Sequence, residues 1–143
     1  MIETLDSEEA ARGWIGETFA PTRDTWTKLD RFVDMLVAEN AQQNLIAAST
    51  IPTIWVRHIA DSAQLALLQP EPQGSWLDIG SGGGLPGVVV AIFYPELPVQ
   101  RVDSDRRKVA FLQTAIRQLG LVNCTATAAR IEELPPADAA NLS

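Results

Sequence analysis

One segment in the middle of the chain limits the possible folds more than any other, and residues 76–87 of it read WLDIGSGGGLPG. An apolar pair leads to Asp78, glycines follow at positions 80, 82 and 84, and an apolar run begins after Pro86. Glycine adopts backbone conformations closed to other residues and lets a ligand approach the main chain. Proline suits the first turn of a helix, where its missing N–H is not needed. The segment therefore predicts a strand, a tight glycine turn and a helix.

Two classes of ligand use such a turn, and Asp78 distinguishes them. A dinucleotide places its pyrophosphate over Gly-x-Gly-x-x-Gly, which Gly82, Gly84 and Gly87 satisfy. S-adenosylmethionine uses an acid followed by alternate glycines, which Asp78, Gly80, Gly82 and Gly84 satisfy. A carboxylate beside the turn repels a pyrophosphate and attracts the ammonium and sulfonium groups of the methyl donor. We therefore favour S-adenosylmethionine and keep a nicotinamide-dependent oxidoreductase as the alternative.

The composition is that of a globular protein with room for one compact domain. The chain has 143 residues, of which 46% are hydrophobic and 20% charged. No stretch approaches the roughly 20 apolar residues of a membrane span, and the N-terminus lacks the pattern of a secretory signal. The single cysteine, Cys124, excludes an internal disulfide and a cysteine-based zinc site. We expect a cytoplasmic monomer with no metal site and no membrane contact.

The net charge of −7 argues against an autonomous nucleic-acid-binding domain, because such domains are usually basic. Any contact with a nucleic acid would therefore use a local patch. The candidates are Arg106, Arg107 and Lys108, with Arg101 nearby, and Arg57 in another segment. The alternative interpretation of the first cluster is a solvated helix face.

Helical patterns fill the first 70 residues. Ser7 predicts a helix start, a second helix runs from about Thr22 to Ala41, and a third follows Ser49 with Pro52 in its first turn. The apolar residues of the second are Trp26, Leu29, Phe32, Val33, Leu36 and Val37, and those of the third are Ile54, Trp55, Ile59, Leu65 and Leu68. Residues 69–74 read as a linker. We expect a helical N-terminal cap over residues 1–70 and a ligand-binding α/β core over residues 71–143.

Strands alternate with helices after the linker. We expect strands over residues 75–79, 99–103 and 124–129, a fourth beginning within 139–142, and helices over 86–94 and 105–119. The second of these helices would be capped by Ser104 and ended by Gly120. This alternation predicts a parallel sheet with right-handed crossovers.

A parallel sheet binds its ligand beyond the carboxyl ends of its strands, and three of the expected strand ends carry suitable groups. The first delivers Asp78 and the glycine turn. The second delivers Asp103, whose carboxylate would accept hydrogen bonds from ribose hydroxyls. The third delivers Arg130, Ile131 and Glu132, placed for the base. The alternative interpretations are a helix cap for Asp103 and an exposed turn for Glu132.

Four segments of the chain resemble the family of ribosomal RNA small subunit methyltransferase G, also called the glucose-inhibited division protein B family. They are Leu77–Gly87, the turn Asn44-Leu45-Ile46, the segment Arg57-His58-Ile59-Ala60-Asp61-Ser62 and the element Arg130-Ile131-Glu132-Glu133. Their order and spacing agree with the family across about residues 25–134. The resemblance implies a Rossmann-like class I methyltransferase fold with a helical N-terminal cap.

The same resemblance implies an activity and a site. The activity is methyl transfer from S-adenosylmethionine to N7 of one guanine in bacterial small-subunit (16S) ribosomal RNA, within a ribosomal particle. The implied cofactor-binding residues, together with those read from the motif, are Asp78, Gly80, Ser81, Gly82, Gly84, Leu85, Asp103, Ile131 and Glu132. A pocket wall near the target base would hold Arg57, His58, Asp61 and Ser62, with no catalytic residue assigned. The alternative for His58 is a structural role, bonded to Asp61 or to a backbone carbonyl.

The chain departs from the family pattern in two places. Residues 38–43 contain no lysine or arginine, although the family often has basic residues just before its Asn-Leu turn. Ser143 falls within the expected fourth strand, before the Arg-Ala step and the further strands of the family. We therefore expect a chain shortened at its C-terminus, and a non-catalytic S-adenosylmethionine-binding domain is the second alternative.

Overall fold

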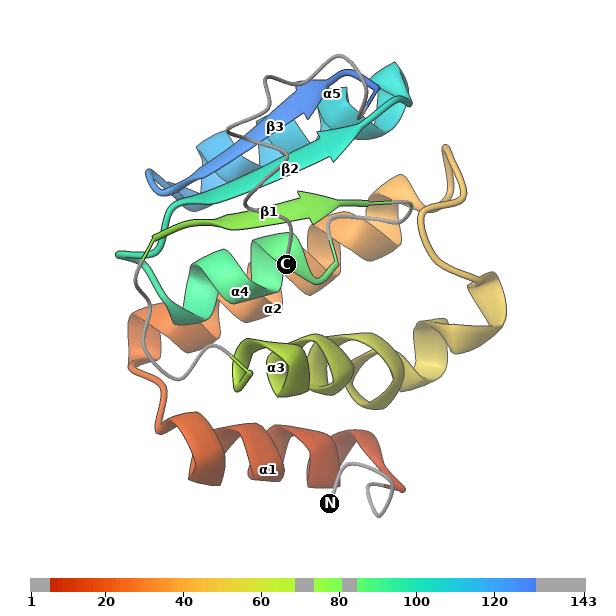
Figure 1. Cartoon of the computed structure of the whole chain (residues 1–143). Coiled ribbons are helices and arrows are strands. Elements are labelled where there is room, and N and C mark those ends of the chain that lie inside the picture. Colours follow the sequence, from red (N-terminus) through yellow and green to blue (C-terminus); the bar gives the residue numbers. More distant parts are fainter. Residues whose placement is uncertain (1–5, 69–73, 81–84, 131–143) are drawn as a thin grey trace.

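The computed structural model describes residues 6–68, 74–80 and 85–130, in which a parallel sheet packs against helices (Figure 1). Its three strands are β1 (Trp76–Ile79), β2 (Val99–Asp103) and β3 (Cys124–Ala128), in the spatial order β1-β2-β3. The register places Asp78 beside Arg101 and Arg101 beside Ala126. This arrangement confirms the expected α/β fold with a parallel sheet.

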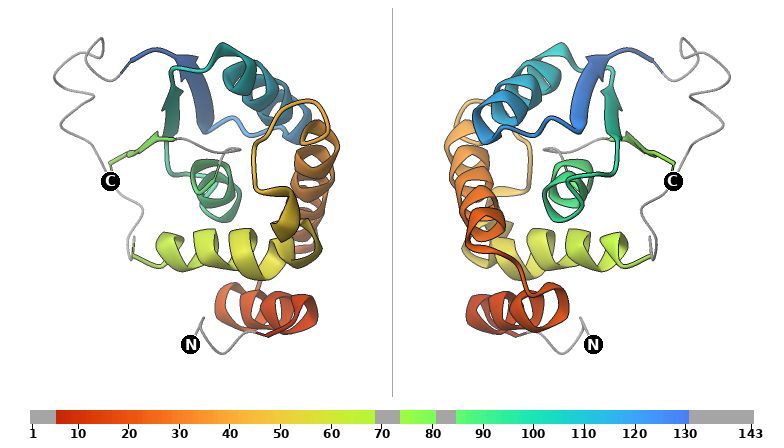
Figure 2. Two further views of the ribbon diagram at one scale, coloured as in Figure 1. Left: turned by 90° about the vertical axis from the view of Figure 1, so that its right-hand side faces the viewer. Right: turned by 90° about the vertical axis from the view of Figure 1, so that its left-hand side faces the viewer.

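Two helices connect the strands and lie on one face of the sheet. They are α4 (Gly87–Phe93) and α5 (Arg106–Leu119). Figure 2 shows both helices on the same side of the strands, with α2 packed on the side of these helices that faces away from the sheet. Each strand lies on the same side of the strand that precedes it in the chain. Because both crossover connections have the same handedness, the two helices lie on one face of the sheet. The same connections bring the carboxyl ends of the three strands to one edge.

The N-terminal helices pack against this layer. They include α1 (Glu8–Phe19), α2 (Arg23–Glu39) and α3 (Ala60–Ala66). The Ser7 hydroxyl accepts the N–H of Ala10 at 3.0 Å, which confirms the expected start of the first helix. Leu29, Phe32 and Leu36 of α2 are fully buried, as the apolar spacing of this helix predicts.

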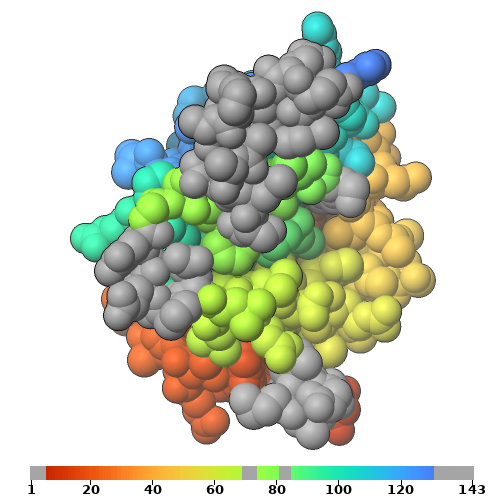
Figure 3. Space-filling view, in the orientation of Figure 1, coloured from red at the N-terminus to blue at the C-terminus, as the bar shows by residue number. Residues whose placement is uncertain are grey.

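One buried core joins the N-terminal helices to the sheet layer, since α2 and α3 both contact α4. In the space-filling view the atoms of α3 lie between those of α1 and those of β1 on the face toward the reader (Figure 3). The division at residue 70 therefore stays a proposal. None of the helices in the part of the chain that the structure describes is long and apolar enough to cross a membrane.

The expected third helix is interrupted. It consists of a 3₁₀ segment, η2 (Ala48–Thr53), a π-helical turn, η3 (Trp55–Ile59), and then α3. Leu65 and Leu68 are 40% and 73% exposed, so their placement on the apolar side was wrong. Because 3₁₀ and π turns differ from 3.6 residues per turn, the apolar spacing does not carry through from Ile54. Ala63 and Ala66 face the core instead.

The boundaries of the second half follow the expectations closely, with one wrong cap. Helix α5 is capped by Asp105 rather than Ser104, because the Asp105 carboxylate accepts the N–H groups of Arg107 and Lys108 at 2.9 and 3.2 Å. Gly120, with φ 67°, ends this helix as expected. Helix α4 begins at Gly87, one residue later than expected. Residues 69–73 of the expected linker and the fourth strand over 139–142 lie outside the described residues.

Candidate functional site

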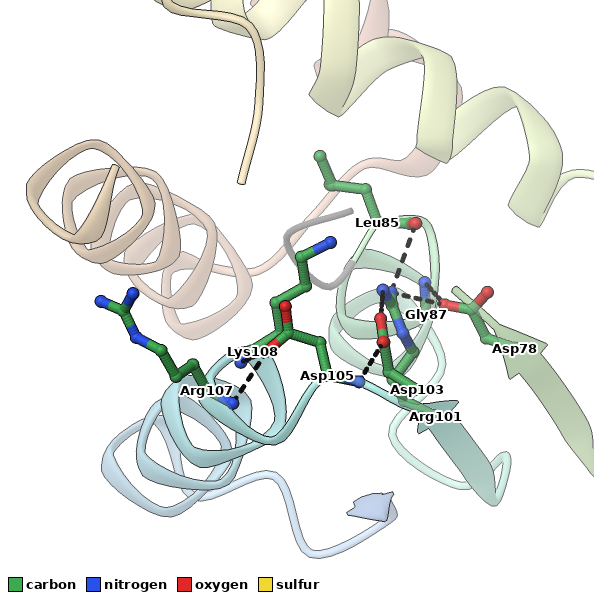
Figure 4. Close-up of polar contacts among 8 residues, drawn as sticks. All are labelled: Asp78, Leu85, Gly87, Arg101, Asp103, Asp105, Arg107 and Lys108. Carbon is green, nitrogen blue, oxygen red and sulfur yellow. Dashed lines mark hydrogen bonds and ion pairs between the residues drawn. The ribbon is translucent and has the colours of Figure 1, made fainter. Parts of the chain in front are cut away.

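Three charged residues meet at the carboxyl edge of the sheet (Figure 4). Asp78 lies on β1, and Arg101 and Asp103 lie on β2. Nη1 of Arg101 is 3.0 Å from Oδ2 of Asp78, and Nη2 is 3.4 Å from Oδ2 of Asp103. Arg101 is completely buried, and Asp78 and Asp103 are 8% and 6% exposed. Two carboxylates therefore share one buried cation.

The expectation that Arg101 lies near a basic surface patch was wrong. Residues i and i+2 of a strand face the same side, so Arg101 points with Asp103 toward the layer that holds α4. The register places Asp78 directly beside it on the neighbouring strand. An arginine without counter-charges would not be stable in this position, and the two acids supply them.

Asp78 joins β1 to the start of α4. Its Oδ2 accepts the N–H of Gly87 at 3.0 Å, in addition to the contact with Arg101. Burial raises the pKa of Asp78, while the Arg101 guanidinium and the Gly87 N–H act in the opposite direction. The carboxylate is thus fixed in position at the end of the strand, and its contact with an ammonium group stays a prediction.

A hollow of about 300 Å³ opens at the same edge. Its lining residues are Ile79, Gly80, Val102, Asp103, Ser104, Ala129 and Arg130. It therefore brings Gly80 and Asp103, two of the expected cofactor residues, together from neighbouring strands. A second hollow of about 410 Å³ shares Ser104, Ala129 and Arg130 with it and adds Arg106.

Gly80 meets the Arg101 guanidinium so closely that a Cβ at this position would overlap it. The carbonyl of Leu85 accepts a hydrogen bond from Nη1 of Arg101 at 3.4 Å. Four expected cofactor residues, Asp78, Gly80, Leu85 and Asp103, thus surround one guanidinium. The others, which are Ser81, Gly82, Gly84, Ile131 and Glu132, lie outside the described residues.

Asp103 has the acceptor capacity that the ribose of an adenosine-containing cofactor would need. Oδ1 of Asp103 accepts the N–H of Asp105 at 2.8 Å, and Oδ2 contacts Arg101. A carboxylate has about four lone-pair positions, so Asp103 can still accept hydrogen bonds from a ribose. Asp103 is not the cap of α5, since Asp105 fills that position. A ribose occurs both in S-adenosylmethionine and in dinucleotides, so this fit alone does not separate them.

The expected pocket wall lies on η3 and α3, and η3 is on the side toward which the strands point (Figure 1). Arg57 and Asp61 are exposed, His58 is partly buried and Ser62 is buried. Nε2 of His58 is 2.8 Å from the Thr50 hydroxyl, rather than bonded to Asp61 or a carbonyl as the structural alternative supposed. Burial and the Arg57 charge lower the pKa of His58, and Asp61 acts in the opposite direction.

Glu8 supports this wall, and nothing in the sequence pattern pointed to it. Its two carboxylate oxygens accept the N–H groups of Trp55 and Val56, each at 2.9 Å. The partners of Glu8 are more than 45 residues away along the chain. The role of Arg101 had a weak signal, because a lone cation in a buried strand needs acids on its neighbours.

The basic cluster at the start of α5 holds the loop that follows α2. Nη2 of Arg107 donates to the carbonyl of Gln42 at 3.1 Å, and Nε2 of Gln43 donates to the carbonyl of Arg107 at 3.2 Å. Arg106 is exposed and lines the second hollow with Arg130. The cluster is therefore partly structural and partly available at the rim of the site.

Comparisons of the sequence with family models and with known proteins all match one family. The family model described as rRNA small subunit methyltransferase G (GidB) matches residues 25–142. The chain is 51% identical over 142 residues to a ribosomal RNA small subunit methyltransferase G of Sphingopyxis alaskensis, covering 99% of this chain and 60% of that protein. It is 53% identical over 116 residues to the protein of that name from Paracoccus denitrificans, covering 81% and 60%. The chain thus spans about three fifths of the length of these relatives.

Proposed function

The chain belongs to the rRNA small subunit methyltransferase G family, and we propose that it binds S-adenosylmethionine and methylates N7 of a guanine in 16S ribosomal RNA. The observation that carries the proposal is the hollow at the carboxyl edge of the sheet, where Gly80 and Asp103 meet. Ligands of open parallel sheets bind at this edge. Family membership favours a methyl donor over a nicotinamide cofactor at this place.

S-adenosylmethionine supplies an electrophilic methyl group, and the described residues would bind and orient its carrier. Asp103 would accept hydrogen bonds from the ribose hydroxyls, and Gly80 would line the hollow beside it. Asp78 would hold the ammonium group at the start of α4. Ser81, Gly82, Gly84 and Leu85 would line the cofactor through the glycine loop, and Ile131 and Glu132 would meet the adenine.

Methylation of the acceptor atom would require alignment of the reacting groups rather than a general base. Guanine N7 has an in-plane lone pair and carries no proton, so its methylation requires no general base. Catalysis would then come from proximity and from a site suited to moving positive charge onto the purine. Arg57, His58, Asp61 and Ser62 would form the wall that positions the base, at the side of the molecule where η3 lies.

The proposed partner is small-subunit RNA within a ribosomal particle, met by a monomer in the cytoplasm. The exposed Arg106 and Arg130 line the second hollow, beside the proposed cofactor site. Arginine is a frequent contact for phosphate in protein complexes with nucleic acids. A particle rather than naked RNA suits a chain of net charge −7, because the basic surface it offers to RNA is local.

A thermal-shift experiment tests the cofactor. A ligand that binds only the native state raises its stability, so S-adenosylhomocysteine should raise Tm and NAD should not. Asp103→Asn should reduce the shift, and Asp34→Asn, a change at an exposed position of α2, should leave it unchanged. A shift with NAD alone would favour the oxidoreductase alternative.

Transfer of a labelled methyl group tests the reaction. The acceptors are a 30S particle that lacks the modification and the naked RNA, with the labelled position mapped afterwards. We expect transfer to N7 of one guanine in the particle. Binding of S-adenosylhomocysteine without transfer to either acceptor would favour the non-catalytic alternative for this chain.

A further inference from the structure

The buried guanidinium of Arg101 uses its two terminal nitrogens for two different strands. Nη1 contacts Asp78 on β1 at 3.0 Å, and Nη2 contacts Asp103 on β2 at 3.4 Å (Figure 4). Nη1 also donates to the carbonyl of Leu85, just before α4. One rigid planar group therefore ties together the ends of two strands and the start of a helix.

The surroundings leave this group little freedom. Arg101 has no exposed surface, and a Cβ added at Gly80 would overlap the guanidinium. The planar fork of arginine has a fixed geometry, so the position of each carboxylate depends on the other. A lysine would keep the charge but would offer one ammonium in place of two separate nitrogens.

We propose that Arg101 is a positioning residue of the cofactor site, which holds the Asp78 and Asp103 carboxylates where they meet the bound ligand. The inference rests on the proposed function, because it takes Asp103 as the ribose acceptor. It adds a residue that touches no ligand and acts through two that do. A merely structural arginine would support the fold and leave the affinity of the folded protein unchanged.

A double-mutant cycle separates the two roles. Calorimetry with S-adenosylhomocysteine measures Kd for the unmodified chain, Arg101→Lys, Asp103→Asn and the double variant. Arg101→Lys should weaken binding about tenfold in the unmodified chain and by a clearly smaller factor when Asp103 is already changed, since only the path through Asp78 then remains. The matched control is Arg117→Lys, an exposed arginine in the last turn of α5, which should bind as the unmodified chain does.

Several outcomes overturn the inference. They are an affinity of Arg101→Lys within about twofold of the unmodified chain, and equal losses in both backgrounds of the cycle. If the unmodified chain binds S-adenosylhomocysteine and the cycle shows equal losses, only the inference fails. If the unmodified chain binds NAD and not S-adenosylhomocysteine, the proposed function fails with it.

A second pair of variants applies if Arg101→Lys does not fold. Arg101→Met combined with Asp78→Asn keeps the summed charge of Arg101, Asp78 and Asp103. It also leaves no carboxylate on β1 without its arginine partner. Compared with Asp78→Asn alone, this variant lacks the guanidinium that contacts Asp103 and the Leu85 carbonyl. It should bind S-adenosylhomocysteine at least about fivefold more weakly than Asp78→Asn, and equal affinities would overturn the inference.

Discussion

Protonation of His58 affects the stability of the folded protein. It is partly buried, with Nε2 2.8 Å from the Thr50 hydroxyl, and burial and Arg57 lower its pKa from the usual 6.5. The unfolded chain therefore takes up a proton at a higher pH than the folded protein. The stability that neutral His58 contributes is present above pH 6.5 and is lost as the pH falls from 6.5 through the lower folded-state pKa.

This sign gives a prediction for the melting temperature. Between about pH 7.5 and about pH 5.5, Tm should fall more for the unmodified chain than for His58→Gln, because glutamine does not titrate. Scanning calorimetry at both pH values measures the difference. Equal falls in Tm would show that His58 has the same pKa in the folded and unfolded states.

The same residue separates binding of the donor from use of the acceptor. His58→Ala should lower the rate of methyl transfer to the particle more than it lowers the affinity for S-adenosylhomocysteine, because His58 lies on η3 rather than on the sheet edge. Transfer rates and calorimetric Kd values test this. Equal losses in both measurements would contradict the placement of His58 at the acceptor.

Gly87 is required by its neighbour rather than by its backbone angles. A Cβ at this position would lie 2.6 Å from Oδ2 of Asp78, the atom that accepts the Gly87 N–H. Gly87→Ala should therefore lower the free energy of unfolding by about 1–3 kcal/mol, through displacement of a buried carboxylate. Urea unfolding measures it.

The matched control is Gly13→Ala in the middle of α1. A Cβ there would meet nothing within 4 Å, so the change should stabilise the protein by about 0.5–1 kcal/mol. Opposite signs at two helical glycines are the expected result. A Gly87→Ala variant as stable as the unmodified chain would contradict the close approach.

At the scale of elements, local signals placed most of the helices and strands. Gly120 predicted the end of α5, and β2 has the expected bounds of residues 99–103. These signals act within a few residues, so they can be read in order along the chain. The parallel sheet followed from the alternation alone, and with it the convergence of Gly80 and Asp103 on one hollow.

The parts that the sequence did not predict depend on contacts between distant segments. The helix expected after Ser49 is interrupted at η2 and η3, where Glu8 of α1 accepts two backbone N–H groups of the π-helical turn. Arg101 meets Asp78 because β1 pairs with β2 in this register, and it meets Asp103 on its own strand. The Glu8 contacts leave no pattern within a window of adjacent residues, and Arg101 leaves only the weak signal of a cation two residues before Asp103 in an expected strand.

Glu8 therefore has an element-scale role that a variant can reveal. Glu8→Ala should lower the free energy of unfolding by about 1.5–3 kcal/mol, because hydrogen bonds to a charged group are lost and two N–H groups are left without this partner. Glu9→Ala removes an exposed acid from the same first turn of α1 and should cost less than about 0.5 kcal/mol. Denaturant unfolding of both variants, with equal losses as the contradicting result, tests the assignment.

The whole molecule combines an acidic net charge with exposed arginines at the carboxyl edge of the sheet. The formal net charge is −7, yet Arg106 and Arg130 line a hollow that adjoins the proposed cofactor site. Repulsion between the acidic surface and RNA should therefore restrict binding to orientations that present this edge. Under the proposed function, such an orientation would bring the acceptor base toward the side on which the strands end.

The two ends of α5 test this orientation. Arg106 begins the helix beside the hollow, and Arg117 lies in its last turn, and both are exposed. Each change to alanine alters the net charge by the same amount, so a non-specific effect of charge would be equal for both variants. A phosphate contact made by Arg106 would appear as a loss of affinity for the particle that Arg117→Ala does not share.

The dependence on salt makes the distinction quantitative. Each phosphate neutralised by a cation contributes about 0.7–0.9 to the slope of log K against log salt concentration. Arg106→Ala should reduce that slope by about this amount, whereas Arg117→Ala should leave it unchanged. Filter binding to the 30S particle over a range of salt concentrations measures both slopes. Identical slopes for the two variants would mean that the RNA approaches by a different face, since the sheet edge would then carry no phosphate contact through Arg106.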